Sequence, residues 1–103
     1  MNRWIGSGQV VKTAFRYTQR GQPYAWMSLQ CHDDEGRVDF LDVVFWDALA
    51  ERVRDFARVD EAAEVTGKVR RKSFTDGQGQ RVFRTEIVAD AVWFPSIRPA
   101  VDV

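Results

Sequence analysis

Residues 38–56 read VDFLDVVFWDALAERVRDF, and this stretch decides the fold. Its first nine residues alternate in character, which predicts a β-strand with an aliphatic face and a second face that carries aromatic and polar groups. The aliphatic parity holds Leu41, Val43 and Phe45, and the other parity holds Phe40, Asp42, Val44 and Trp46. Apolar side chains then recur at helical spacing at Leu49, Val53 and Phe56. This spacing predicts one short helix of about three turns, with Asp47 as its N-cap.

Two further strands are expected before this stretch. The segment from Arg3 to Tyr17 is rich in β-branched and aromatic residues, and we expect it to bend at Gly6 and Gly8. A turn at residues 20–23 follows. From residue 24 to residue 32, aromatic and polar side chains alternate with smaller apolar ones. The first set is Tyr24, Trp26, Ser28, Gln30 and His32, and the second is Ala25, Met27, Leu29 and Cys31. This period of two predicts a strand with the same two-faced character.

A long hairpin is expected after the helix. Residues 62–75 and 80–93 are predicted to be strands joined by a turn at Asp76-Gly77-Gln78-Gly79. Residues 95–103 contain two prolines and no periodicity, so we expect a domain over residues 1–94 and a short loose tail. The order is strand, strand, strand, helix, strand, strand. It predicts an all-β OB-fold, a five-stranded Greek-key β-barrel with one short helix between strands 3 and 4, a fold whose exposed strand face holds oligonucleotides.

Composition limits the classes of protein that remain. The chain has 103 residues, of which 45% are hydrophobic and 29% charged, as in ordinary globular domains. No apolar run approaches the roughly 20 residues of a membrane helix, and no secretory signal is visible, so we expect a cytoplasmic protein. Cys31 and His32 are the only cysteine and histidine, which excludes an internal disulfide and a zinc site built from cysteine and histidine.

Charge is distributed unevenly although the formal net charge is zero. Residues 1–32 contain four basic residues and no acidic one, and residues 67–84 contain six basic residues against Asp76 alone. Residues 33–64 reverse this balance, with eleven acidic residues against four arginines. The basic residues of the first two segments are Arg3, Lys12, Arg16, Arg20, Lys68, Arg70, Arg71, Lys72, Arg81 and Arg84. Two readings stay open, a surface that binds a polyanion and a pair of solvated faces.

Several separated motifs resemble one family, the bacterial single-stranded DNA-binding proteins. Asn2-Arg3 with Gly8 resembles the opening of the family's first strand, and residues 43–51 (VVFWDALAE) are similar to its strand-into-helix segment. Residues 65–76 (VTGKVRRKSFTD), Gly79 and residues 85–89 (TEIVA) resemble its long basic hairpin. The resemblance covers roughly residues 2–93 and implies binding of single-stranded DNA by homo-oligomers, commonly tetramers. A related branch of the family, primosomal replication protein N, shares the fold and the opening residues, and resemblance to it implies a dimer in place of a tetramer.

The sequence departs from the family pattern in two places. Family members usually continue into a Gly/Pro/Gln-rich linker and an acidic tip that ends in Pro-Phe, whereas this sequence stops at Val103. We therefore expect no tail-dependent recruitment of partner enzymes, although other replication proteins remain possible partners. Asp42 stands where family members tend to have a basic residue. We expect its carboxylate to repel a phosphate there.

The resemblance places Phe40, Trp46 and Phe74 at positions where the family stacks bases. Trp26 lies on the matching face of its strand and is assigned to the site, with a subunit interface as its alternative role. Binding of a single strand by stacking also needs cations between the aromatic rings, which contact the phosphate backbone of the DNA. The expected phosphate contacts are Arg3, Lys12, Arg16, Arg70, Arg71, Lys72 and Arg84. Phe15, Phe45, Phe56 and Phe83 are expected in the core, and Trp4, Trp93 and Phe94 in the core or at a subunit contact.

No enzymatic activity, cofactor or metal is expected. The only imidazole and the only thiol point to opposite faces of one strand, and no activated serine or lysine is apparent. Asp33, Asp34 and Glu35 suit a solvent-exposed turn better than the metal site of a nuclease. The remaining alternative function is an OB-fold protein-interaction module of a replication restart complex, with DNA binding as a secondary property.

Overall fold

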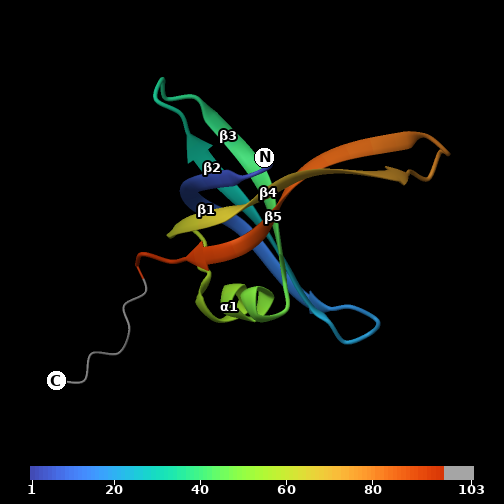
Figure 1. Cartoon of the computed structure of the whole chain (residues 1–103), viewed down its shortest axis with the longest axis horizontal. Helices are drawn as coiled ribbons and strands as arrows, with labels where there is room; N and C mark the ends of the chain where they lie inside the picture. Colours follow the sequence, from blue (N-terminus) through green and yellow to red (C-terminus); the bar gives the residue numbers. More distant parts are fainter. Residues whose placement is uncertain (97–103) are drawn as a thin grey trace.

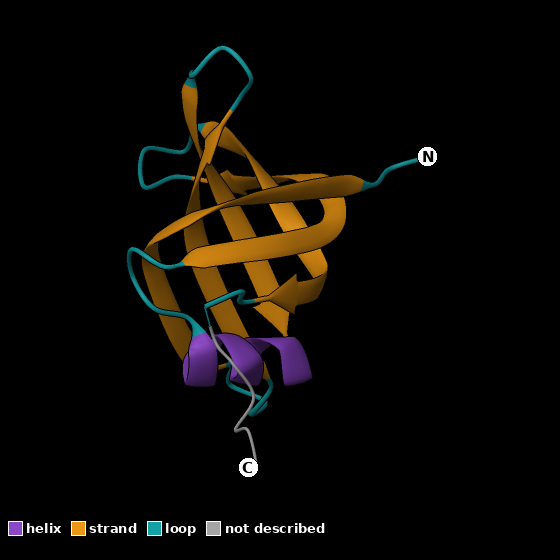
Figure 2. Ribbon diagram, turned by 90° about the vertical axis from the view of Figure 1, so that its left-hand side faces the viewer, coloured by secondary structure: helices purple, strands orange, loops and turns teal. Residues whose placement is uncertain are grey.

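The computed structural model describes residues 1–96 and consists of a closed five-stranded barrel with one helix (Figure 1). The elements are β1 (Trp4–Tyr17), β2 (Pro23–His32), β3 (Val38–Trp46), α1 (Ala48–Phe56), β4 (Ala62–Thr75) and β5 (Arg81–Trp93). The strands close in the order β1-β2-β3-β5-β4, and α1 lies across one end of the barrel (Figure 2). The predicted OB-fold, with its helix between the third and fourth strands, is confirmed. Residues 97–103 of the expected tail lie outside the described residues.

β1 closes the barrel because it changes its pairing partner halfway along. Its first half, Trp4 to Gln9, pairs antiparallel with β4, and its second half, from Gln9 onward, pairs with β2. Gly8 lies next to this change, where a Cβ atom would come within 2.2 Å of the Gln30 carbonyl oxygen. A register shift between Val10 and Lys12 follows. The expected bend near the glycines therefore coincides with the point where β1 exchanges β4 for β2 as its pairing partner.

Asp47 is the N-cap residue of α1, as predicted, and its carbonyl accepts the first helical hydrogen bond from Glu51 at 3.1 Å, but the expected cap through its side-chain oxygen is wrong. Asp47 has a φ of 57°, and its side chain makes no hydrogen bond to the first turn of α1. Its backbone N–H donates to the Pro23 carbonyl at 3.0 Å, and its carboxylate accepts from the Gln22 side chain at 3.4 Å. These contacts with Gln22 and the first residue of β2 hold Asp47 at a positive φ, and its carboxylate bonds to Gln22 in place of the first turn of the helix.

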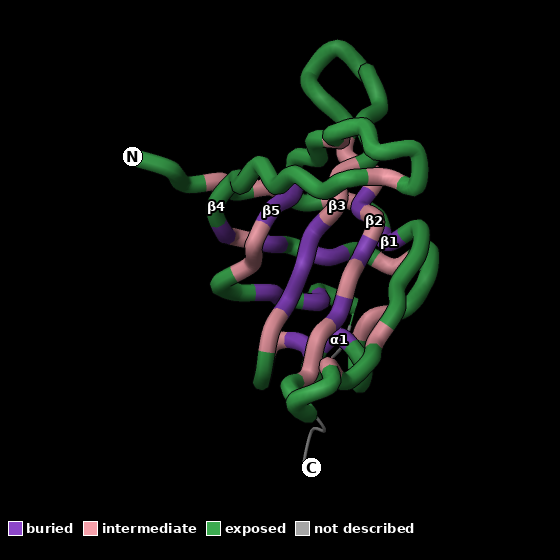
Figure 3. Tube along the Cα trace, turned by 90° about the vertical axis from the view of Figure 1, so that its right-hand side faces the viewer, coloured by how far each residue is buried: buried purple, intermediate pink, exposed green. Residues whose placement is uncertain are grey.

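The core follows the aliphatic parity of the strands. Met27, Leu29, Val43 and Phe45 are fully buried, and α1 adds Ala50 and Val53. Figure 3 shows buried positions alternating with partly exposed ones along β2, whereas in β3 Val43, Val44 and Phe45 are all buried although Val44 has the outer parity. Among the aromatic residues, Phe45 and Phe94 are confirmed in the core, and Phe15 and Trp4 are half-buried against it.

Three of the residues considered for the core are exposed instead. Phe56 ends α1 and is 37% exposed, Phe83 is 51% exposed, and Trp93 is 54% exposed. Phe83 shares the parity of Ile87, which is buried in the barrel. However, β4 and β5 extend past the barrel as a two-stranded arm (Figure 1), so the same face of β5 has no core to pack against at Phe83. Phe83 was expected in the core because aromatic residues are common in barrel cores, and this reasoning carries no information about the length of the barrel.

Among residues 1–96, no helix is long and apolar enough to cross a bilayer.

Candidate functional site

The outer face of β1, β2 and β3 gathers most of the expected site residues of the barrel. Antiparallel pairing places side chains of three strands side by side in rows. The rows are Lys12–Ser28–Asp42, Ala14–Trp26–Val44 and Arg16–Tyr24–Trp46, and Gln30–Phe40 extends the face along β2 and β3. Lys12, Arg16, Trp26, Phe40 and Trp46, which were assigned to the site from the sequence, therefore share one face.

Aromatic rings and one guanidinium are in contact along the third row. The rings of Tyr24 and Trp46 meet edge to face, with 4.8 Å between centroids and an interplanar angle of 62°. The Arg16 Cζ atom lies 5.2 Å from the centroid of the Tyr24 ring. Phe40, farther along β3, is 61% exposed. The rings are open to solvent to different degrees, and none of Trp26, Phe40 and Trp46 is sealed in the core.

Asp42 interacts with Trp26 in the neighbouring row. The Trp26 Nε1–H group donates a hydrogen bond of 3.1 Å to Asp42 Oδ1. One oxygen of this carboxylate is thereby occupied by a side chain of the same face. The sequence alone suggested a charge that repels phosphate, whereas the structure shows an acceptor that holds an aromatic ring.

The β4–β5 arm contributes a second wall. Because paired residues of an antiparallel ladder point to the same side, one face of the arm, here called the front face, is defined by the pairs Arg70–Glu86, Lys72–Arg84 and Phe74–Val82. Lys72 and Arg84 of the front face line a groove of about 350 Å³ together with residues of β1 and β2. The other lining residues are Ala14, Phe15, Arg16, Tyr24 and Trp26. The groove therefore has an aromatic floor on the barrel and cationic groups on both sides.

Glu86 stands at the base of the front face and is 4% exposed. Its Oε1 lies 2.9 Å from the Arg70 Nη2 atom, and its Oε2 lies 3.8 Å from the Lys72 Nζ atom. The carboxylate thus holds two of the expected phosphate contacts at the base of the arm. Burial raises the pKa of the Tyr24 phenol above its ordinary value, and the negative charge of Glu86 raises this pKa further. Tyr24 is therefore a neutral hydrogen-bonding group at neutral pH.

The structure does not bring all expected contacts together. Phe74 is 42% exposed on the front face, with the Arg84 Cζ atom 5.8 Å from its centroid, whereas Arg71 points to the opposite face of the arm. Arg3 lies elsewhere, in a recess of about 400 Å³ that is also lined by Lys68 and Asp90. The expected cationic surface is therefore divided among three places.

Sequence reasoning assigned no role to Tyr24 or Glu86. The parity of Tyr24 matched that of Trp26, so alternation already placed both on one face. Glu86 carried no comparable signal, because its burial depends on Arg70 and Lys72 of the neighbouring strand. In the described part of the chain, no group of three or more His, Cys, Asp or Glu side chains is arranged to hold a metal ion.

Comparisons with known proteins agree in one family. A family model described as the single-strand binding protein family matches residues 1–95. Single-stranded DNA-binding protein 2 of Listeria monocytogenes is 35% identical over 91% of this chain and 63% of its own length. Single-stranded DNA-binding protein A of Bacillus subtilis is 33% identical over 91% of this chain and 59% of its own length. The chain thus spans about three fifths of these relatives.

A solved structure shares the fold over nearly its whole length. The SSB domain of a Synechococcus protein superposes with a TM-score of 0.70 at 26% identity, and the match covers 89% of this chain and 93% of that one.

Proposed function

Because the chain belongs to the single-strand binding protein family, we propose that it binds single-stranded DNA with little sequence preference, in replication, recombination or plasmid transfer. The observation that carries this proposal is the groove between the outer face of the barrel and the front face of the arm. Its walls combine Tyr24 and Trp26 with Arg16, Lys72 and Arg84. Aromatic rings interleaved with cations are what a non-specific single-strand site requires.

Stacking supplies affinity without sequence choice, since every base presents a π face. Each stacked base contributes on the order of 1–3 kcal/mol by alanine substitution. Phe40 and Phe74 are open to solvent, and Trp46 is half-buried beside Tyr24. In this proposal, bases stack on Phe40, Trp46, Phe74 and Trp26, while the phosphates follow the cations of β1 and of the front face.

Phosphate contacts make the affinity depend on salt. Each phosphate neutralised on a single strand contributes about −0.7 to the slope of log K against log salt. Glu86 holds Arg70 and Lys72 at the base of the arm, so these cations are oriented before DNA arrives. We expect strong binding at low salt that weakens as salt is added.

Titration of intrinsic tryptophan fluorescence with a homopyrimidine oligonucleotide tests the proposal. We expect quenching that weakens at high salt, and weaker binding by Trp46→Ala and Phe74→Ala. Phe56→Ala is the matched control, because this exposed ring lies on α1 and does not line the groove. An unchanged signal from the wild-type protein at micromolar concentration and low salt would rule the proposal out.

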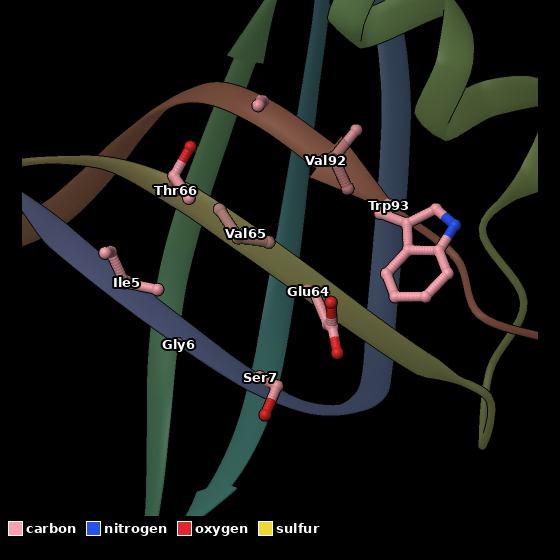
Figure 4. Close-up of a pocket in the computed structure, with 9 residues that line it drawn as sticks. Ile5, Gly6, Ser7, Glu64, Val65, Thr66, Val92 and Trp93 are labelled. Atoms are coloured by element: carbon pink, nitrogen blue, oxygen red, sulfur yellow. The ribbon is translucent and has the colours of Figure 1, made fainter.

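We also propose that the chain forms a homo-oligomer, dimer or tetramer, through the face shown in Figure 4. Ile5 of β1 is 68% exposed and Trp93 of β5 is 54% exposed, and the two lie on either side of β4. They line an open depression of about 510 Å³ with Val65, Thr66 and Val92. Residues 4–8 of β1 pair only with β4 in the described strands, so their second backbone edge is available to another copy.

Sedimentation equilibrium separates this assembly from a monomer. We expect Ile5→Glu and Trp93→Glu to lower the measured mass toward that of one chain. Val59→Glu changes a similarly exposed aliphatic residue that does not line the depression, and it should leave the mass unchanged. A wild-type mass equal to one chain contradicts the oligomer and leaves the DNA-binding proposal standing.

A further inference from the structure

The second face of the β4–β5 arm, here called the back face, carries its own exposed side chains. It is defined by Val69, Arg71, Ser73, Arg81 and Phe83, whose parity is opposite to that of the front face. Phe83 is 51% exposed and Val69 is 39% exposed. This face continues the inner face of the barrel beyond its last core residue, Ile87, and the arm projects freely (Figure 1). Its aromatic ring is half exposed to solvent.

The back face holds an aromatic ring between guanidinium groups. The Arg71 Cζ atom lies 3.8 Å from the centroid of the Phe83 ring, and the Arg81 Cζ atom lies 5.7 Å from it. Arg81 also donates a hydrogen bond of 3.2 Å to the Ser73 hydroxyl. The cations are therefore ordered around the ring.

No carboxylate opposes these cations on the arm between residues 69 and 85. Asp76 is the one acidic residue in this range, and its Oδ1 accepts hydrogen bonds from the backbone N–H groups of Gln78 and Gln80 at 2.9 Å each. Its carboxylate thus belongs to the turn at the tip. The back face presents uncompensated positive charge, which favours a polyanion over an acidic-and-basic protein surface.

The two faces of the arm repeat one arrangement. On the front face Arg84 lies near Phe74, and on the back face Arg71 lies over Phe83. The pairs Phe74–Val82 and Ser73–Phe83 are neighbouring rows of the same ladder. The two rings therefore lie one row apart on opposite sides of a two-stranded ribbon, a separation that a single strand of nucleic acid passing around the edge of the ribbon can span.

We propose that the back face binds a second segment of the same single-stranded DNA, which passes from the groove around the arm and stacks on the Arg71–Phe83 pair. The inference rests on the proposed function. It adds a contact that short oligonucleotides confined to the groove do not reach. The arm is then a two-sided binding element, and it lengthens the stretch of DNA that one chain covers.

Oligonucleotide length separates the two faces. OB-fold sites cover about 4–16 nucleotides, so homopyrimidine strands of roughly 5 and roughly 20 nucleotides represent the groove alone and both faces. We expect the double variant Phe83→Ala/Arg71→Ala to bind the short strand within about twofold of wild type and the long strand about tenfold more weakly. The matched double variant Phe74→Ala/Arg84→Ala should weaken both. The single variant Arg71→Ala keeps the Phe83 ring. For the long strand, it should reduce the magnitude of the slope of log K against log salt by about 0.7.

Three results would overturn the inference. One is wild-type affinity of the Phe83→Ala/Arg71→Ala variant for the long strand. Another is an equal loss for both strand lengths. The third is a change in the mass of the free variant in sedimentation, which would make the back face a contact between copies of the chain. Failure of the wild-type protein to bind either strand contradicts the proposed function itself, and the two failures are thereby distinguishable. Thermal unfolding by circular dichroism checks that each variant is folded.

Discussion

The indole nitrogen of Trp26 and the carboxylate of Asp42 are joined by a 3.1 Å hydrogen bond between neighbouring strands of the barrel. The two residues lie one row apart on the outer face, at a sequence separation of 16. This bond fixes the direction of a ring that lines the groove, and it places a negative charge among the cations of the same face. Asp42 therefore has two opposing effects on a bound strand, repulsion of phosphate and positioning of Trp26.

Comparison of Asp42→Asn with Asp42→Ala separates these effects. Both substitutions remove the charge, but only asparagine keeps an oxygen acceptor for the indole N–H. A neutral hydrogen bond contributes about 0.5–1.5 kcal/mol, so Asp42→Ala should bind a homopyrimidine oligonucleotide roughly two- to tenfold more weakly than Asp42→Asn. Equal affinities in fluorescence titrations would show that the bond does not position Trp26 for binding.

The cations of the groove should be visible in the salt dependence of binding. Arg84→Ala and Lys72→Ala should each lower the magnitude of the slope of log K against log salt by about 0.7. Arg52→Ala is the control, because Arg52 lies on α1 over the Phe56 ring and outside the groove. A slope that changes equally in all three variants would mean that overall charge, and not the groove, controls binding.

Tyr24 should titrate above its ordinary pKa of 10.0, because burial and the charge of Glu86 both favour the neutral phenol. A pKa raised by folding stabilises the protein at every pH below the unfolded value, and this contribution is lost as the pH rises through the folded pKa. Because the chain contains a second tyrosine, Tyr17, the titration of Tyr24 is obtained as the difference in phenolate absorbance between wild type and Tyr24→Phe, and we expect its midpoint above pH 10. Glu86→Gln should lower the pKa of Tyr24. A Tyr24 pKa that is the same in Glu86→Gln as in the wild-type protein would contradict the electrostatic influence of Glu86 on Tyr24.

Gly8 and Gly67 are required by close backbone approaches. A Cβ atom at Gly8 would lie 2.2 Å from the Gln30 carbonyl oxygen, and one at Gly67 would lie 2.2 Å from the Val88 carbonyl oxygen. Since a backbone carbonyl in a ladder cannot move aside cheaply, Gly8→Ala and Gly67→Ala should each lower the free energy of unfolding by about 3 kcal/mol. Gly77→Ala meets no atom within 4 Å and should change it by less than about 0.5 kcal/mol. Urea denaturation measures all three.

The direction of a side chain along a strand proved to be readable from the sequence. Period-two alternation placed Met27 and Leu29 inside the barrel and Trp26 and Trp46 on its outer face. The order of the strands and the helix could also be predicted, because each element shows its own periodicity within a short stretch of sequence. Together, the faces of the strands and the order of the elements were sufficient to predict the OB-fold.

The partner of each side chain was decided only by the tertiary structure. Residues 70–72 form a single cluster of cations along the chain, but in the β4–β5 ladder Arg71 lies on the back face while Arg70 and Lys72 meet Glu86 on the front face. Phe83 was expected in the core because aromatic residues are common there, and it is exposed because the arm has left the barrel at that point. Side-chain direction follows from the dihedral angles of neighbouring residues, whereas burial and pairing depend on strands that are distant in the sequence.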